Sequence, residues 1–317
     1  PDEEGHPRPA RVPWFGYQLF DGNSLIGARA EVYAATSIAK GAKPAWHEQA
    51  PRRLDPQAPD RRADEVYHFL LPDPGMASYT DKVAKGLYAD DFARLKVWRK
   101  TFCAPLQSYE IARLQQLSAK VDDLWAAHAA QLQGDRRATE DHLSVWPAEG
   151  HNDTITSRAS KEAIRRQGLL NEDGDEATPY RRLKLVMDYW CALWFWPIRA
   201  SHRLPSRDEW WMEVGAILEG NIVDVSPDLP LPFGYDRPGV PLVTANAPRL
   251  PEFEEQPALA VQDVSPQLHD RLGRLRITRL REAFKRIGEV EALAKARRFL
   301  HWELAFADVF HTRERQL

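Results

Sequence analysis

Three ionisable side chains stand close together near the C-terminal end of the sequence, at His301, Glu303 and Asp308. An imidazole and two carboxylates are groups that proteins use to move protons in general acid–base catalysis. They also fit the polar side of a short strand or turn whose other side is buried. We favour the second interpretation, which makes core residues of the apolar neighbours Trp302, Leu304, Phe306, Val309 and Phe310.

A second candidate for chemistry is a basic segment before this one. Residues 265–300 contain ten Lys or Arg and four Asp or Glu, a net charge of +6 in a chain whose net charge is -3. Such a concentration is typical of phosphate binding, and we select Arg274, Arg279 and Arg281 as possible contacts to DNA phosphates. The alternative is a solvated helix face with internal ion pairs, or arginines bound to the acidic residues at 252–255. Both interpretations stay open.

Three segments share their residue pattern with a known family. Residues 20–28 read Phe-Asp-Gly-Asn-Ser-Leu-Ile-Gly-Ala, residues 189–197 read Tyr-Trp-Cys-Ala-Leu-Trp-Phe-Trp-Pro, and residues 299–310 read Phe-Leu-His-Trp-Glu-Leu-Ala-Phe-Ala-Asp-Val-Phe. All three resemble segments of the large adenine-specific DNA methyltransferases of bacterial defence, both the fused type IIG restriction–modification enzymes and the methylase of DISARM-type systems. The three segments frame most of the chain.

The resemblance implies a parent enzyme that transfers a methyl group from S-adenosylmethionine to the exocyclic amine of adenine in DNA. In that family the catalytic Asn-Pro-Pro-aromatic tetrapeptide follows the segment similar to 299–310, and a glycine-rich cofactor loop precedes the segment similar to 20–28. Neither is present in this sequence. We therefore expect an internal fragment that is inactive alone and that contains no catalytic residue. The implied partners are DNA and further subunits of a defence system.

Asn23 is the one cofactor-binding residue that the resemblance implies. The family has Asn or Asp at this position, facing the adenine of S-adenosylmethionine, where a carbonyl oxygen can accept a hydrogen bond from the adenine amine. The competing interpretation is a turn without a ligand, because Asp, Gly, Asn and Ser at 21–24 are common turn residues. A rival function for the whole chain is a non-catalytic helical interaction module that docks partner subunits or DNA.

Composition excludes several other classes of protein. With 43% hydrophobic and 28% charged residues, the chain is an ordinary globular sequence, and no apolar run is long enough to span a bilayer. The two cysteines, Cys103 and Cys191, are too few for a disulfide framework, which favours a cytoplasmic setting. The ten histidines form no zinc-binding pattern, so no metal is expected.

The fold class we expect is mainly α, with small strand remnants at both ends, as in a helical insertion of a Rossmann-like methyltransferase. Apolar residues at three- and four-residue steps predict helices. Proline breaks and polar stretches separate them, including an expected loop at 134–150. Short strands are expected at 17–22 and 66–71. The predicted helices cover residues 90–102, 108–125, 157–170, 180–196, 206–219 and 265–299.

The domain organisation we expect has five parts. They are the edge of a methyltransferase sheet at 1–35, a loop at 36–64, a helical domain at 65–223, a proline-rich loop at 224–263, and a basic helical region leading back to the methyltransferase core at 264–317. Tryptophan is abundant, with eleven residues. At helical spacing beside leucines, we expect tryptophans to be core residues rather than stacking platforms for bases: Trp190, Trp194, Trp196, Trp210 and Trp211.

Overall fold

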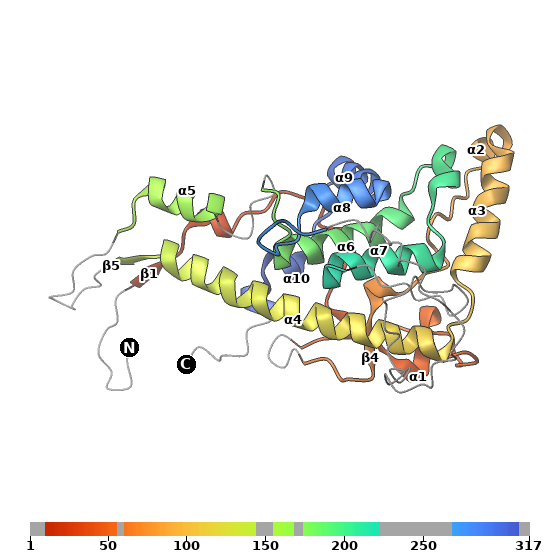
Figure 1. The fold of residues 1–317 in the computed structure, drawn as a ribbon, viewed down its shortest axis with the longest axis horizontal. Helices are drawn as coiled ribbons and strands as arrows, with labels where there is room; N and C mark the ends of the chain where they lie inside the picture. Colours follow the sequence, from red (N-terminus) through yellow and green to blue (C-terminus); the bar gives the residue numbers. More distant parts are fainter. Residues whose placement is uncertain (1–9, 56–59, 144–154, 168–173, 222–267, 311–317) are drawn as a thin grey trace, which may run out of the picture.

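The computed structural model describes residues 10–55, 60–143, 155–167, 174–221 and 268–310. This part of the chain is mainly helical, as expected (Figure 1). The α-helices are α1 (Ala35–Ile38), α2 (Lys82–Leu87), α3 (Ala89–Phe102), α4 (Ser108–Thr139), α5 (Arg158–Gln167), α6 (Pro179–Trp194), α7 (Arg207–Glu219), α8 (Ile277–Ala283), α9 (Lys285–Arg297), α10 (Trp302–Ala305) and α11 (Ala307–Phe310).

Two small sheets accompany the helices. Strand β1 (Ala10–Val12) pairs antiparallel with β5 (Asp141–Leu143), and β2 (Glu31–Ala34) lies between β3 (Arg52–Arg53) and β4 (Glu65–Tyr67) in an antiparallel sheet. Short 3-10 helices span Phe15–Tyr17, Trp46–Glu48, His68–Leu70 and Ile198–Arg203. Neither sheet has the extent of a Rossmann-like core, and β4 is buried within the helical body.

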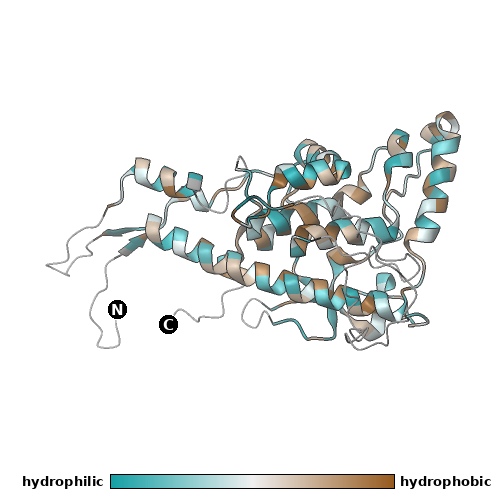
Figure 2. Cartoon of the chain, in the orientation of Figure 1, coloured by the Kyte–Doolittle hydropathy of each residue, from teal (hydrophilic) through white to brown (hydrophobic). Residues whose placement is uncertain are grey.

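The body is organised around α4 and α6. Helix α4 runs along the length of the molecule, and α6, α7 and α9 lie on one side of it (Figure 1). Apolar residues recur along α4 with helical period and are buried, including Leu114, Leu117 and Val121. Eleven of the sixteen residues of helix α6 are buried, and hydrophobic and hydrophilic residues are mixed along this interior helix (Figure 2). Trp196, Trp210 and Trp211 are fully buried, whereas Trp190 and Trp194 are half-buried against the same core.

Local sequence signals placed several helix ends correctly. Ser206 caps α7 through a capping box, in which its hydroxyl accepts from the Glu209 amide and the Glu209 carboxylate accepts from the Ser206 amide. Gly220 ends the helix in the left-handed conformation with a φ of 80°. The helices predicted at 90–102, 157–170 and 180–196 correspond to α3, α5 and α6.

Other expectations were wrong. Helix α4 continues through Gly134 to Thr139, where a loop was expected, because a single glycine costs a helix interior only about 1 kcal/mol and the continued turns keep their backbone hydrogen bonds. The strand expected at 17–22 is replaced by the 3-10 helix at Phe15–Tyr17. The strand expected at 66–71 ends at Tyr67 and continues as a 3-10 turn. The region 36–64 is not all loop, since it contains β3 and most of α1.

The C-terminal region also differs from expectation. The helix predicted at 265–299 is two helices, α8 and α9, which meet at Phe284. No strand forms beyond Phe299 in the described residues up to 310. A single bridge at Phe299 is followed by the one-turn helices α10 and α11. The proline-rich loop expected at 224–263 and the acidic residues at 252–255 lie outside the described residues.

Candidate functional site

Two segments from opposite ends of the chain lie side by side in parallel. The Asn23 amide donates to the Arg298 carbonyl at 2.6 Å, and the Leu300 amide donates to the Ile26 carbonyl at 2.9 Å. Asn23 and Phe299 form an isolated parallel bridge. We call residues 20–30 together with 298–303 the terminal junction. The terminal junction brings together the segments 20–28 and 299–310, the first and third of those that resemble the family.

Glycines allow this close approach. A Cβ atom on Gly27 would lie 2.0 Å from the carbonyl oxygen of Leu300, and one on Gly22 would lie 2.8 Å from the Leu300 Cβ. The first overlap is with backbone, which cannot turn aside as a flexible side chain can. Glycine at position 27 of the Gly-Asn-Ser-Leu-Ile-Gly motif is therefore required by contact with residue 300.

A buried histidine holds the terminal junction against α6. The His301 ring accepts at Nδ1 from the Ala28 amide at 3.0 Å, and its Nε2 lies 2.9 Å from Oδ1 of Asp188. Because the amide can only donate, Nε2 must hold the ring proton and donate it to the carboxylate. Lys184 donates to the other carboxylate oxygen at 2.9 Å. Burial alone would raise the pKa of Asp188, but His301 and Lys184 outweigh it and hold that pKa below its ordinary value.

The carboxylate of Glu303 makes a second buried contact. It accepts from the Ala30 amide and from Arg53, whose Nη2 lies 2.7 Å away. Only 3% of Glu303 is exposed. His301, just before α10, thus binds the Ala28 amide, and Glu303, within α10, binds the Ala30 amide. Both side chains are engaged in holding the fold together.

The pattern of buried and exposed side chains at 301–309 is the reverse of the expected one. His301 and Glu303 are buried, while Trp302 is 45% exposed and Val309 is 60% exposed, so the expectation that these two apolar residues form the core was wrong. Leu304 is buried as expected. Burial of these polar residues is tolerated because each has a partner, which offsets the cost of desolvation. Asp308 is likewise paired, with Arg136 at 2.8 Å.

Helix α6 supplies the third segment of the resemblance. The ring of Phe195, which follows α6, packs on Phe299 with centroids 5.8 Å apart. Cys191 is buried against the Ala28 backbone, and burial raises the pKa of its thiol. Residues 20–28, 189–197 and 299–310 therefore converge at one place. Asp188 and Lys184 were not singled out from the sequence, although an acid between two large apolar residues of a buried helix is a signal for a buried partner.

Asn23 closes a turn. Its side-chain oxygen Oδ1 accepts from the Leu25 amide at 3.1 Å, which is an Asx turn. A carbonyl oxygen has two lone pairs, so one acceptor position is still available. The side chain is half-buried, and Leu25 beside it is 92% exposed. The contact from Asn23 to adenine stays a prediction.

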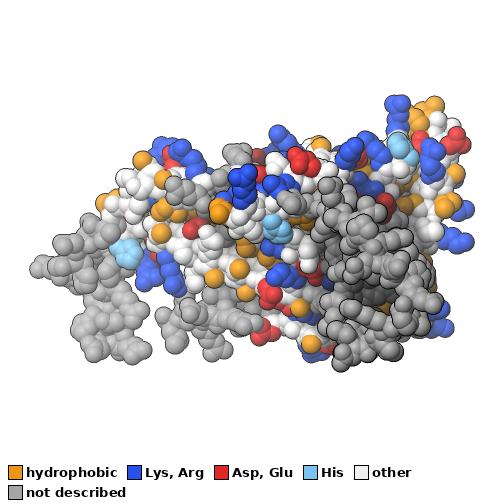
Figure 3. All heavy atoms as spheres, in the orientation of Figure 1, with side chains coloured by type: hydrophobic (Ala, Val, Ile, Leu, Met, Phe, Trp, Pro, Cys, Tyr) orange, Lys and Arg blue, Asp and Glu red, His pale blue; other side chains and the backbone are white. Residues whose placement is uncertain are grey.

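The three arginines selected for DNA contact are engaged within the protein. Arg274 pairs with Asp270 at 3.1 Å, and Arg281 pairs with Glu291 through Nε and Nη2, the closer contact at 2.6 Å. Arg279 donates to the His269 carbonyl. Basic side chains over α8 and α9 lie among acidic ones (Figure 3). These pairs fit the alternative of internal ion pairing, and phosphate contact by these arginines stays a prediction.

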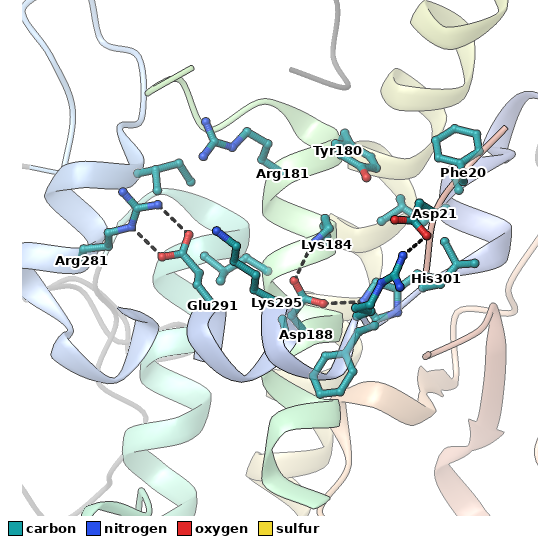
Figure 4. A pocket seen from close by; sticks show the side chains of 18 residues that line it. Phe20, Asp21, Tyr180, Arg181, Lys184, Asp188, Arg281, Glu291, Lys295 and His301 are labelled. Carbon is teal, nitrogen blue, oxygen red and sulfur yellow. Dashed lines mark hydrogen bonds and ion pairs between the residues drawn. The ribbon is translucent and has the colours of Figure 1, made fainter. Parts of the chain in front are cut away.

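A cleft of about 500 Å³ opens beside the terminal junction (Figure 4). Its walls come from α6, α8, α9, the segment at 20–21 and the segment at 298–305. Five Lys or Arg and three Asp or Glu line it, an excess of two positive charges. We call it the basic cleft. Its carboxylates are those of Asp21, Asp188 and Glu291.

Within the described residues, no group of three or more His, Cys, Asp or Glu side chains is placed to hold a metal ion. None of the described helices has the length and apolar character needed to cross a bilayer. No protein-family model, curated protein or solved structure matches the chain.

Proposed function

We propose that the chain is part of an adenine-specific DNA methyltransferase of a restriction or phage-defence system. In this proposal it forms the helical region between the cofactor-adenine motif and the catalytic Asn-Pro-Pro-aromatic motif. The parent enzyme transfers the methyl group of S-adenosylmethionine to the exocyclic amine of adenine. Asn23 contacts the cofactor adenine, and the catalytic residues lie outside residues 1–317.

One observation carries the proposal. The three segments with the family pattern are separated by more than a hundred residues from one another, yet the Ala28 amide donates to the His301 ring and Phe195 packs on Phe299. A helical insertion in a sheet must leave and re-enter that sheet at neighbouring places, because its two ends continue into strands of one structure. The parallel pairing of Asn23 with Phe299 supplies two such neighbouring ends.

A second candidate function is a helical interaction module that docks partner subunits. The observation in its favour is a set of exposed apolar side chains at and near the terminal junction. Leu25 is 92% exposed, Leu19 is 71% exposed and Trp302 is 45% exposed. Trp302 lies beside Leu25, since its Nε1 donates to the Ser24 carbonyl at 3.4 Å, and contiguous exposed apolar surface marks contact sites. A methyltransferase core in the same polypeptide and a separate subunit would both cover it.

The reading frame that encodes the chain distinguishes these two functions. The methyltransferase proposal predicts a glycine-rich Asp-Pro-x-x-Gly-x-Gly loop encoded before residue 1 and Asn-Pro-Pro followed by an aromatic residue encoded after residue 317. Sequencing the complete reading frame is the test. A frame that lacks both motifs would refute the methyltransferase and leave the interaction module.

A further inference from the structure

A second, smaller pocket lies apart from the basic cleft and shares no lining residue with it. Its volume is about 140 Å³, and its walls come from residues 37–47, the turn at 72–74 and the link between α3 and α4 at 103–106. A parallel bridge between Ala39 and Leu106 joins two of these segments. The pocket therefore lies beside α1, at the end of the molecule where α4 begins (Figure 1). We call it the apolar pocket.

The apolar pocket has the size and the lining for a ring of six carbon atoms. Ile38 and Leu106 line it, and both side chains are buried. The ring of Trp46 is also in the lining, where edge-on contacts with Tyr33 and His47 hold it at centroid distances of 5.5 and 5.4 Å. An apolar cavity of about 150 Å³ is large enough to hold benzene, so the space here admits a body of that size.

The ionisable groups at the apolar pocket favour an anion. Lys40 and His47 are exposed and line it, and the lining contains no Asp or Glu. Within the described residues, Lys40 forms no ion pair. Two carboxylates lie close by outside the lining, and each accepts from a backbone amide: Asp73 from Gly75 at 2.7 Å, and Glu48 from Ala45 at 3.1 Å. An ammonium and an imidazole can both donate to a ligand carboxylate.

The remaining polar groups in and behind the wall add no free charge. Cys103 is half-buried in the lining, and burial raises the pKa of its thiol to about 12, so the thiol is protonated at neutral pH. Arg207 donates to the Ala104 carbonyl in the wall, but it also pairs with Glu110 at 2.6 Å. Lys40 and His47 are therefore the groups that an anionic ligand would meet.

We propose that the apolar pocket binds a small aromatic carboxylic acid, with its ring beside Ile38 and Leu106 and its carboxylate at Lys40 and His47. The ring fits the volume and the apolar walls, and the carboxylate fits the two basic groups. This site goes beyond the proposed methyl transfer. It involves neither Asn23 nor the terminal junction, so its test is independent of the test of that function.

Ligand-observed NMR titration of the 317-residue protein tests the site with three probes. Benzoate has both the ring and the carboxylate, benzamide has the ring without the charge, and acetate has the charge without the ring. We expect benzoate to bind about fivefold more tightly than benzamide, through the attraction of Lys40, and at least about tenfold more tightly than acetate, through burial of the ring. No binding of benzoate, or equal affinity for benzoate and either of the other probes, would overturn the proposal.

Two exposed lysines provide a matched pair of variants. Lys40→Ala removes the ammonium at the apolar pocket, and we expect it to weaken benzoate binding about fivefold while benzamide binding stays within about twofold of wild type. Lys82→Ala removes the same charge from α2, outside the pocket, and should leave both affinities within about twofold. Both substitutions are at the surface, so both variants should fold. Equal weakening of benzoate binding by the two variants, or a loss of benzamide binding that matches the loss for benzoate in Lys40→Ala, would contradict the assigned carboxylate position.

Discussion

His301 donates its Nε2 proton to Asp188 across 2.9 Å, and 113 residues of sequence separate the two. Both side chains are at most 4% exposed. The same ring accepts from the Ala28 amide, so one side chain joins the N-terminal segment, α6 and the C-terminal segment. The terminal junction therefore depends on a buried polar contact as well as on apolar packing.

Removing that contact should destabilise the protein strongly. His301→Ala leaves the Asp188 carboxylate buried without its main hydrogen-bond donor, which typically costs about 3–5 kcal/mol in the free energy of unfolding. His202→Ala is the control, because His202 is exposed and a surface substitution should change stability by no more than about 0.5 kcal/mol. Denaturant unfolding of both variants is the measurement. Similar stabilities for the two would show that His301 does not hold the junction.

Two glycine substitutions should have effects of opposite sign. Gly27→Ala places a Cβ atom 2.0 Å from the Leu300 carbonyl oxygen and should cost about 3 kcal/mol by forcing the two segments apart. Gly134→Ala adds a methyl group to open space inside α4 and should stabilise the protein by about 1 kcal/mol, from helix propensity. The measurement is the thermal melting temperature of each variant compared with that of the wild type. A Gly27 variant that melts at or above the wild-type temperature would contradict the close approach.

Stability should fall as the pH is lowered below neutral, in part through His128. Its Nε2 donates to the Leu304 carbonyl at 2.8 Å, and burial lowers its pKa from 6.5 to about 4. Between these values the unfolded chain binds the proton and the folded protein does not, so unfolding becomes easier as pH decreases.

The His128→Gln variant isolates this effect. Glutamine can still donate to the Leu304 carbonyl but does not titrate. We expect the wild type to lose about 2 kcal/mol more than the variant between about pH 7 and about pH 5. Denaturant unfolding at the two pH values gives the difference. A parallel decrease in the two proteins would assign the acid sensitivity to other groups.

The tryptophans of α7 should be structural. Trp211 is 1% exposed, and its Nε1 donates to the Leu70 carbonyl at 3.0 Å. Trp211→Ala should cost about 3–5 kcal/mol through the cavity it leaves. Trp211→Phe retains most of the packing and should cost about 1–2 kcal/mol for the lost hydrogen bond. Thermal melting curves of the two variants are the measurement. Equal losses of stability would show that the hydrogen bond contributes more to stability than the packing does.

Local signals in the sequence were sufficient for much of the helical fold. The capping box of Ser206 with Glu209, and the glycine at 220, act within one turn of their own helix, so the sequence alone placed both ends of α7. The apolar period of α4 likewise predicted which face is buried. The glycine at 134 was a weak signal for a helix end, and α4 continues through it to Thr139.

The terminal junction could not be predicted from local patterns. His301 and Glu303 are buried because their partners, Asp188 and the Ala28 and Ala30 amides, come from distant parts of the chain. A polar residue with no partner nearby in the sequence is expected at the surface. His301 and Glu303 were therefore expected to be exposed, and Trp302 and Val309 to be buried. The ion pair of Arg281 with Glu291, ten residues later, was missed for the same reason.

Methyl transfer is the most direct test of the proposed function. The protein encoded by the complete reading frame is incubated with labelled S-adenosylmethionine and duplex DNA, beside the 317-residue chain and an Asn23→Ala variant of the complete protein. We predict label on the exocyclic amine of adenine with the complete protein, less with the variant at low cofactor concentration, and none with the chain alone. Absence of adenine methylation by the complete protein, or transfer by the isolated chain above background, would contradict the account.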